Sequence, residues 1–140
     1  MKQTFGKNER LCSPRVIGRL FQRGSADVHT FYLYPFRVLY MYDQQPLSPL
    51  PQVLFSVAKK SFKKAVDRNL IRRRCRESYR LHKEPLLSNP AGSRPSYIAF
   101  LYLAKEITTY DVIEPAMKQS IKRLGKLPHS LQKTRTDNSL

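Results

Sequence analysis

Four arginines, Arg68, Arg72, Arg76 and Arg80, stand at intervals of four residues in the middle of this chain. On an α-helix this spacing stacks their side chains along one face. Like charges in such a row repel one another, at a cost of about a few tenths of a kcal/mol per pair, unless an anion neutralises them. Planar guanidinium groups suit the oxygens of phosphate in particular. The row therefore predicts contact with a nucleic acid.

These arginines belong to a basic stretch, residues 59–83, that holds eleven lysines and arginines. The whole chain carries 26 basic residues against 10 acidic ones, a formal net charge of +16. Such a charge favours association with polyanions, and added salt should weaken that association steeply. A merely well-solvated surface is the alternative, but charge that is clustered rather than spread argues against it. We call the candidate contacts the basic ridge: Lys59, Lys60, Lys63, Lys64, Arg68, Asn69, Arg72, Arg73, Arg76 and Arg80.

Groups that could break bonds are scarce in this sequence. Asp67 and Glu77 lie among the arginines and are expected to be charge partners within the helix. No spaced pair of carboxylates suggests acid–base catalysis or a metal-ion pair, and the GxSxG, P-loop and HExxH motifs are absent. Cys75 could be a thiolate nucleophile beside arginines, but its place on the apolar side of the helix favours packing. The histidines are scattered, which argues against a zinc cluster. The sequence therefore predicts no catalytic residue and no metal site on this chain.

Neighbouring strands and helices must hold the basic ridge at the surface. A strand is expected over residues 53–58, with one apolar and one more polar face, and the basic helix runs from about residue 64 to 83. A nearly all-apolar strand over residues 96–104 should be buried on both faces. The basic helix would then be the crossover connection between the two strands. Its buried side should comprise Ile71, Cys75, Ser78 and Tyr79, with Ala65 nearby.

Two further helices flank this unit. Ser13 and Pro14 are typical of an N-cap and a first helical position, so a short amphipathic helix is expected over residues 14–23. Apolar residues at helical spacing predict a last helix that starts within residues 108–111. Pro115 fits this last helix only in its first turn.

A second candidate surface comes from an aromatic-rich stretch over residues 31–43, which Pro35 splits or places at a sheet edge. Alternation along this stretch places part of it on the more polar sheet face, where the first helix could close a groove. Aromatic side chains beside cations can stack unpaired bases, each worth about 1–3 kcal/mol. For Ile17 and Phe21 of the first helix, spacing alone favours ordinary packing in the core. The predicted groove consists of Ile17, Phe21, Val38, Tyr40 and Ser56.

The length of 140 residues suits one domain. We expect a flexible segment over residues 1–8, a folded domain over 9–125, and a basic, disordered tail over 126–140. No apolar run is long enough to cross a bilayer, and the N-terminus lacks the apolar core of a signal peptide. A cytoplasmic protein with reduced cysteines and no membrane partner is therefore expected.

Over residues 53–80 the chain resembles the protein subunit of bacterial ribonuclease P. That family has a strand ending in Ser-Val-x-Lys-Lys, then Ala-Val, then an Arg-Asn-Arg helix start with further basic residues. The likeness covers about residues 9–124 and departs from the family in two places. Leu70 replaces the second motif arginine, with Arg74 one turn later as a displaced cation, and Ile17 stands where an aromatic residue is common. The matching residues are Ser56, Val57, Lys59, Lys60, Ala65, Val66, Arg68, Asn69, Arg72, Arg73 and Arg76.

The resemblance implies an α+β fold, a two-layer α/β sandwich with a small mixed sheet and a left-handed β-α-β crossover, of a kind also found in a ribosomal protein domain. It further implies that residues 9–125 are a ribonuclease P protein domain whose basic ridge binds the catalytic RNA, one protein to one RNA. The predicted groove would hold the 5′ leader of precursor tRNA. The RNA, with its own bound Mg²⁺, would hydrolyse the phosphodiester, and the protein alone would bind no cofactor.

Three other functions fit parts of the pattern. A structural RNA-binding protein of the ribosomal type would share the charge but would not need the groove. A stand-alone protein nuclease would cleave without RNA. A DNA-binding regulator would place the basic helix in a major groove.

Overall fold

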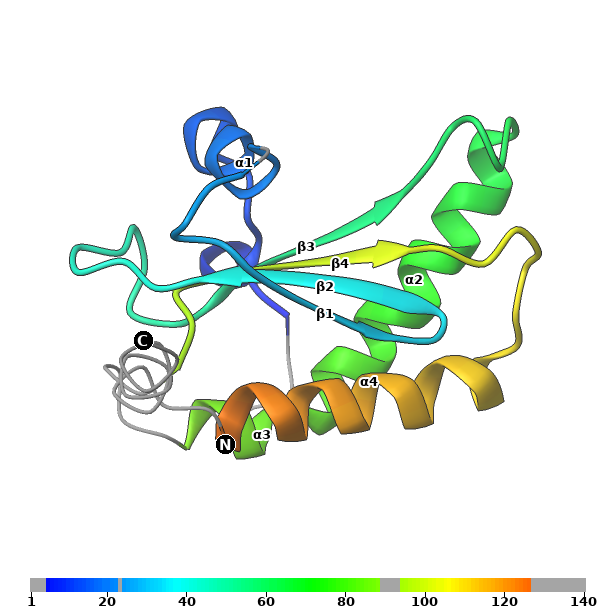
Figure 1. Ribbon diagram of the computed structural model, residues 1–140. Coiled ribbons are helices and arrows are strands. Elements are labelled where there is room, and N and C mark those ends of the chain that lie inside the picture. The colour runs from blue at the N-terminus through cyan, green and yellow to red at the C-terminus, as the bar shows by residue number, and fades with distance from the viewer. Residues whose placement is uncertain (1–4, 23, 89–93, 127–140) are drawn as a thin grey trace, which may run out of the picture.

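The computed structural model describes residues 5–22, 24–88 and 94–126. Its elements are η1 (Lys7–Glu9), α1 (Pro14–Leu20), β1 (His29–Leu33), β2 (Phe36–Met41), β3 (Gln52–Val57), α2 (Ala65–His82), α3 (Glu84–Leu87), β4 (Tyr97–Tyr102) and α4 (Tyr110–Lys126). One sheet in the order β1-β2-β4-β3 packs against α2 and α4, while α1 lies across the opposite face (Figure 1). The sheet and the two long helices make the expected α+β sandwich. No helix in the described residues is long and apolar enough to cross a membrane.

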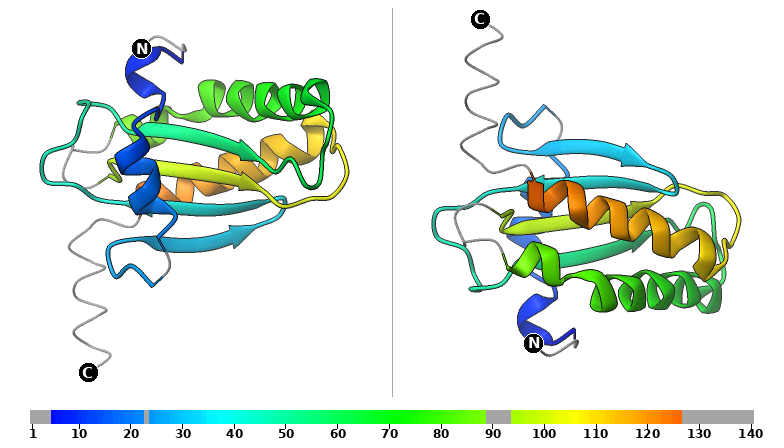
Figure 2. Two further views of the ribbon diagram at one scale, coloured as in Figure 1. Left: turned by 90° about the horizontal axis from the view of Figure 1, so that it is seen from above. Right: turned by 90° about the horizontal axis from the view of Figure 1, so that it is seen from below.

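The crossover between β3 and β4 carries the basic helix, as the sequence predicts. These two strands pair in parallel, whereas β1 with β2 and β2 with β4 pair antiparallel, so the sheet is mixed. The right-hand view of Figure 2 looks onto the helix side of the sheet, where α2 runs along the β3 edge, and the chain passes from β3 through α2 to β4 with a left-handed turn. Such connections are right-handed in about 98% of cases, so only the family resemblance indicated this hand.

The sheet separates two apolar clusters. On the side of α2 and α4, the buried residues include Phe36, Val38 and Tyr40 from alternate positions of β2. On the side of α1, they include Leu39 and Met41 from the intervening positions. Strand β4 is buried on both faces, as its nearly continuous apolar sequence predicts.

Two helices differ in detail from expectation. Ser13 caps α1, its Oγ accepting a hydrogen bond from the backbone N of Val16 at 3.4 Å, but the helix ends at Leu20 rather than near residue 23. Gly24 lies in the following turn with φ +71°, a conformation that glycine adopts without strain. In α4, Pro115 lies beyond the first turn. It is exposed, so water can reach the carbonyl that its missing N–H leaves unpaired.

The boundary of the folded region at residue 9 is wrong. Phe5 packs on the core, with its ring centroid 5.7 Å from that of Phe55 and 5.8 Å from that of Tyr79. The helix η1 follows directly, so the fold begins by residue 5. Ala65 is exposed at the start of α2 rather than near its buried side. The predicted tail lies outside the described residues, except that α4 includes residue 126.

Candidate nucleic-acid interface

The apolar side of α2 fixes which of its side chains reach solvent. Ile71, Cys75, Ser78 and Tyr79 are all buried, as predicted. Burial raises the pKa of the Cys75 thiol from its ordinary value of 9.0 to about 12. A thiol that holds its proton so firmly packs in the core and is no nucleophile. The arginines on the other side of the helix therefore form a surface on a well-anchored element.

The arginine row divides into anchored and open members. Arg68 Nη1 donates to the carbonyl oxygens of Phe62 at 2.8 Å and Lys63 at 3.0 Å, so this arginine ties the β3–α2 link to the helix. Arg72 Nη1 donates to Asn69 Oδ1 at 2.9 Å, which holds both polar groups in place. Arg76 is exposed on the next turn.

The last arginine of the row, Arg80, pairs with Glu77 on the same helix. The hydrogen bond from Arg80 is the main cause that lowers the pKa of the Glu77 carboxyl, so Glu77 stays ionised at neutral pH. This confirms the prediction that Glu77 is a charge partner within the helix. The net positive charge at this end of α2 is correspondingly reduced.

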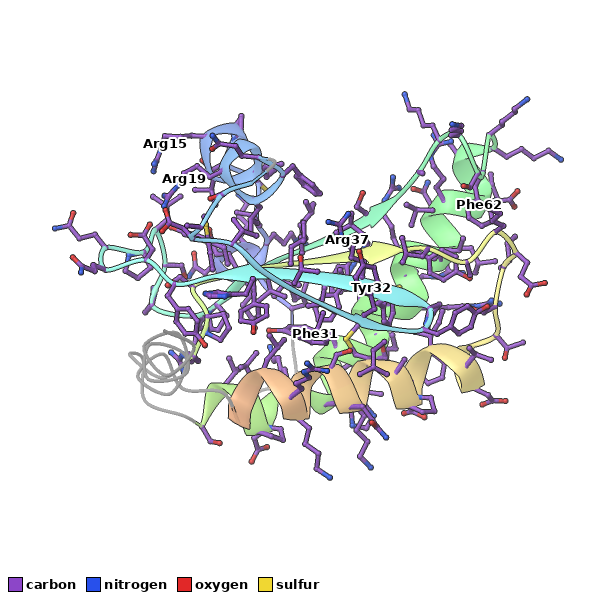
Figure 3. All side chains as sticks on the ribbon, viewed as in Figure 1. Arg15, Arg19, Phe31, Tyr32, Arg37 and Phe62 are labelled. Carbon is purple, nitrogen blue, oxygen red and sulfur yellow. The ribbon has the colours of Figure 1, made fainter. Side chains whose placement is uncertain are left out.

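The link between β3 and α2 supplies the other cations. Phe62 is buried, with its ring centroid 5.8 Å from that of Tyr102, and Figure 3 labels it near the start of α2. This anchor fixes the loop while its neighbours remain in solvent. The exposed members of the basic ridge are Lys59, Lys60, Lys63, Lys64, Asn69, Arg73 and Arg76, and the half-buried ones are Arg68, Arg72 and Arg80.

The cation one turn after Leu70 does not replace the missing motif arginine. Arg74 Nη1 donates to the carbonyl oxygen of Thr108 at 2.7 Å, which ties α2 to the segment before α4. Arg74 is half-buried in this position. The expectation of a cation displaced by one turn is therefore wrong, because that guanidinium is used inside the fold.

The predicted groove is also wrong in two of its five residues. Val38 is fully buried and Tyr40 is 5% exposed, and both belong to the cluster that packs against α2 and α4. The register explains the error, because β2 pairs with β4 rather than with β3, and Val38 lies opposite Phe100, which in turn lies opposite Phe55. All three side chains therefore point away from α1.

The remaining predicted groove residues do share the α1 side of the sheet. Ile17 is half-buried against the cluster under α1, and Phe21 at the end of that helix is 41% exposed. Ser56 aligns across the sheet with Leu101, and Leu101 with Arg37 of β2. Ser56 is half-buried in this row.

Sequence reasoning missed Arg37 and Tyr32, which extend the row to β1. The guanidinium carbon of Arg37 lies 5.7 Å from the centroid of the Tyr32 ring, and Figure 3 shows both residues on the strands below α1. Tyr32 is 62% exposed. Strand alternation could have found Arg37, since it stands two residues before Leu39 and therefore faces the same side.

Among the described residues, hollows open on both sides of this interface. One, of about 290 Å³, lies between the end of α1 and the β1–β2 part of the sheet. The other, of about 220 Å³, lies beside β3 and is lined by Arg10, Arg72 and Arg76 over an apolar floor that includes Phe55. The open α1 side of the sheet and the basic ridge therefore border the same strand, β3.

Several carboxylates near these surfaces have side-chain partners. Glu9 pairs with Lys83 and Asp43 with Arg19 at 3.5 Å, and Oε2 of Glu114 lies 2.9 Å from Nε2 of His82. Among the described residues, no group of three or more histidine, cysteine, aspartate or glutamate side chains could hold a metal ion.

Comparison with known proteins gives a consistent result. The family model described as Ribonuclease P matches residues 5–125. The Ribonuclease P protein component of Porphyromonas gingivalis is 38% identical over 135 residues, covering 93% of this chain and 95% of that protein. The component of Chlorobaculum tepidum is 34% identical over 130 residues, covering 86% and 84% of the two chains.

Solved structures show the same fold. A Staphylococcus aureus RNase P protein mutant, described as having defective mRNA degradation activity, aligns with a TM-score of 0.64 at 22% identity, covering 86% of this chain and 91% of that one. A structure of the Staphylococcus aureus RNase P protein aligns with a TM-score of 0.61 at 19% identity, covering 86% and 98%.

Proposed function

This chain belongs to the ribonuclease P protein family, and from that premise we propose how its two surfaces serve RNA cleavage. It is the protein component of an RNA-cleaving enzyme that acts in tRNA processing. The proposal assigns the basic ridge to the RNA subunit and the α1 side of the sheet to the 5′ leader of precursor tRNA. The observation that carries it is the exposed basic ridge on a firmly packed helix.

The basic ridge suits a folded RNA because it is both charged and rigid. Arg68 ties the lysine-bearing link to α2, and Phe62 anchors that link in the core. A link held in this way loses little backbone freedom when its lysines meet phosphates. Guanidinium groups such as that of Arg76 also match phosphate oxygens in pairs. These features support a contact with the RNA subunit that is strongest from the lysine-bearing link to Arg76.

The α1 side of the sheet suits single-stranded RNA. Phe21 offers an exposed aromatic face, while Ser56 and Arg37 offer polar groups on a flat strand surface. Stacking on such a platform accepts any base and needs the base to be unpaired. A leader is single-stranded, whereas the acceptor stem of mature tRNA is a helix, so this surface favours precursor over product. Val38 and Tyr40 are not part of it.

The groups that break the phosphodiester belong to the RNA in this proposal. Glu77 is paired with Arg80 and Asp43 with Arg19, so these two carboxylates serve the fold. Mg²⁺ is assigned to the RNA because phosphate oxygens and water are its preferred ligands. One protein joins one RNA subunit, and the complex works in the cytoplasm, where the free thiols of Cys12 and Cys75 remain reduced.

Reconstitution tests this division of labour. The purified chain is mixed with its ribonuclease P RNA and a precursor tRNA, and cleavage is followed as the Mg²⁺ concentration is lowered. We expect the protein to accelerate cleavage most at low Mg²⁺, because the basic ridge screens repulsion between the two RNAs. Cleavage by the protein without RNA would instead support a stand-alone nuclease. Binding without any acceleration would support a purely structural RNA-binding protein.

A further inference from the structure

The hollow of about 290 Å³ beside the end of α1 has the size and lining of a site for one small ligand. Its floor is the sheet, at Thr30, Arg37 and Leu39. Its rim is the last turn of α1 and the segment that follows, including Phe21 and Gln22. Aromatic, apolar and hydrogen-bonding groups thus face one open hollow, which is the combination that a nucleobase requires.

Arg37 is the polar group that distinguishes this hollow. Its Nε is buried and has no hydrogen-bond partner among the described residues. The guanidinium lies near the exposed ring of Tyr32, at 5.7 Å from the centroid, so the ring helps hold the cation at the hollow. A buried donor without a partner costs free energy that an incoming acceptor would recover. The hollow therefore favours a ligand with hydrogen-bond acceptors on one edge.

We propose that this hollow binds one unpaired guanine of the RNA leader, with Arg37 donating to its O6 and N7 acceptors. The proposal rests on the assignment of the leader to the α1 side of the sheet and adds a base preference to it. Guanine is the base that offers two adjacent acceptors on its Hoogsteen edge, and arginine is their commonest partner in proteins. The exposed ring of Phe21 supplies a surface for the face of the base.

Base preference provides the test. The full chain and its RNA subunit are assembled, and equilibrium binding is measured for precursor tRNAs whose A/U leaders carry one guanine at successive positions. At one position we expect guanine to bind about 5- to 150-fold more tightly than adenine. Arg37→Met should abolish this difference while the preference for precursor over mature tRNA persists. Arg15→Met removes the same charge from an exposed site on α1 and should leave the base preference intact.

Nucleotide analogues test the contact without altering the protein. Replacing the preferred guanine by 7-deazaguanine removes the N7 acceptor and should weaken binding by the wild-type enzyme, whereas inosine keeps O6 and N7 and should not. The proposal is overturned if no leader position prefers guanine, if the preference survives Arg37→Met, or if 7-deazaguanine binds as well as guanine. Equal binding of precursor and mature tRNA by the wild type would instead refute the leader assignment itself.

Discussion

Lys83 at the end of α2 and Glu9 in η1 form a buried ion pair, with Nζ of the lysine 2.6 Å from Oε1 of the glutamate. Their side chains are 4% and 7% exposed. The second oxygen of Glu9 accepts a hydrogen bond from the backbone N of Gly6 at 3.2 Å. Two segments 74 residues apart in the chain are thereby joined, and the N-terminal segment secures the far end of the basic helix.

Removing one member of this pair should be costly. Glu9→Gln removes the carboxylate that pairs with the buried Lys83 ammonium, and breaking a buried ion pair in this way typically costs about 3–5 kcal/mol. We expect the free energy of unfolding, measured with urea, to fall by that amount. The double variant Glu9→Gln, Lys83→Met has no buried charge at this site and should lose less than the sum of the two single variants. Additive losses would show that the two groups do not interact.

The salt dependence of RNA binding should show whether the exposed Arg76 contacts a phosphate. Arg76→Ala removes one exposed cation from the basic ridge, so the slope of log K against log salt for the RNA subunit should flatten by about one unit. Lys122→Ala, on the exposed side of α4, provides a matched loss of charge and should leave the slope unchanged. An unchanged slope for Arg76→Ala would argue against a phosphate contact.

Alkaline pH should destabilise the protein through Cys75. Burial raises the pKa of this thiol in the fold from 9.0 to about 12, so the unfolded chain loses the proton first as pH rises. Stability is therefore fully present below pH 9 and declines between pH 9 and 12, by up to about 1.4 kcal/mol per pH unit for this group. The Tyr79 hydroxyl, whose pKa is also raised chiefly by burial, adds to the decline above pH 10.

Urea unfolding at pH 8, 9 and 10 measures this decline. Cys75→Ala has no ionisable group at this position, so its curve of stability against pH should be flatter by the contribution of one proton, although the variant is less stable overall because of the cavity. Parallel curves for the wild type and the variant would contradict the linkage to Cys75.

Local spacing was sufficient to predict the parts of the fold that depend on near neighbours. Ile71, Cys75 and Tyr79 follow one another at helical intervals, so the buried side of α2 could be read before any tertiary contact was known. The hydrogen bond between Arg74 and Thr108 could not be predicted in this way, because it joins residues 34 positions apart. The charged residues of the interface could therefore be predicted from the sequence, but the hydrogen bonds that hold some of them inside the fold could not.

The predicted groove was wrong in Val38 and Tyr40 for a similar reason. Alternation correctly separated Val38 from Leu39, but it does not say which face of a strand meets which helix. That choice depends on the order of the strands, and β4 lies between β2 and β3 although it comes last in the sequence. A local pattern contains no information on this insertion. Arg37 could have been assigned to the α1 side from its alternation with Leu39, whereas its alignment with Leu101 of β4 joins segments that are far apart in the chain.

Phe21 and Tyr40 lie on opposite sides of the sheet, so their alanine variants should behave differently. Phe21→Ala removes an exposed ring from the α1 side, so binding of leader-bearing tRNA should weaken about 5- to 150-fold while binding of mature tRNA changes little. Tyr40→Ala truncates a buried ring beside α4 and should lower stability by about 3–5 kcal/mol. Its effect on properly folded enzyme should be equal for both tRNAs. A selective loss of leader binding in Tyr40→Ala, with Phe21→Ala unaffected, would reverse the assignment of the faces.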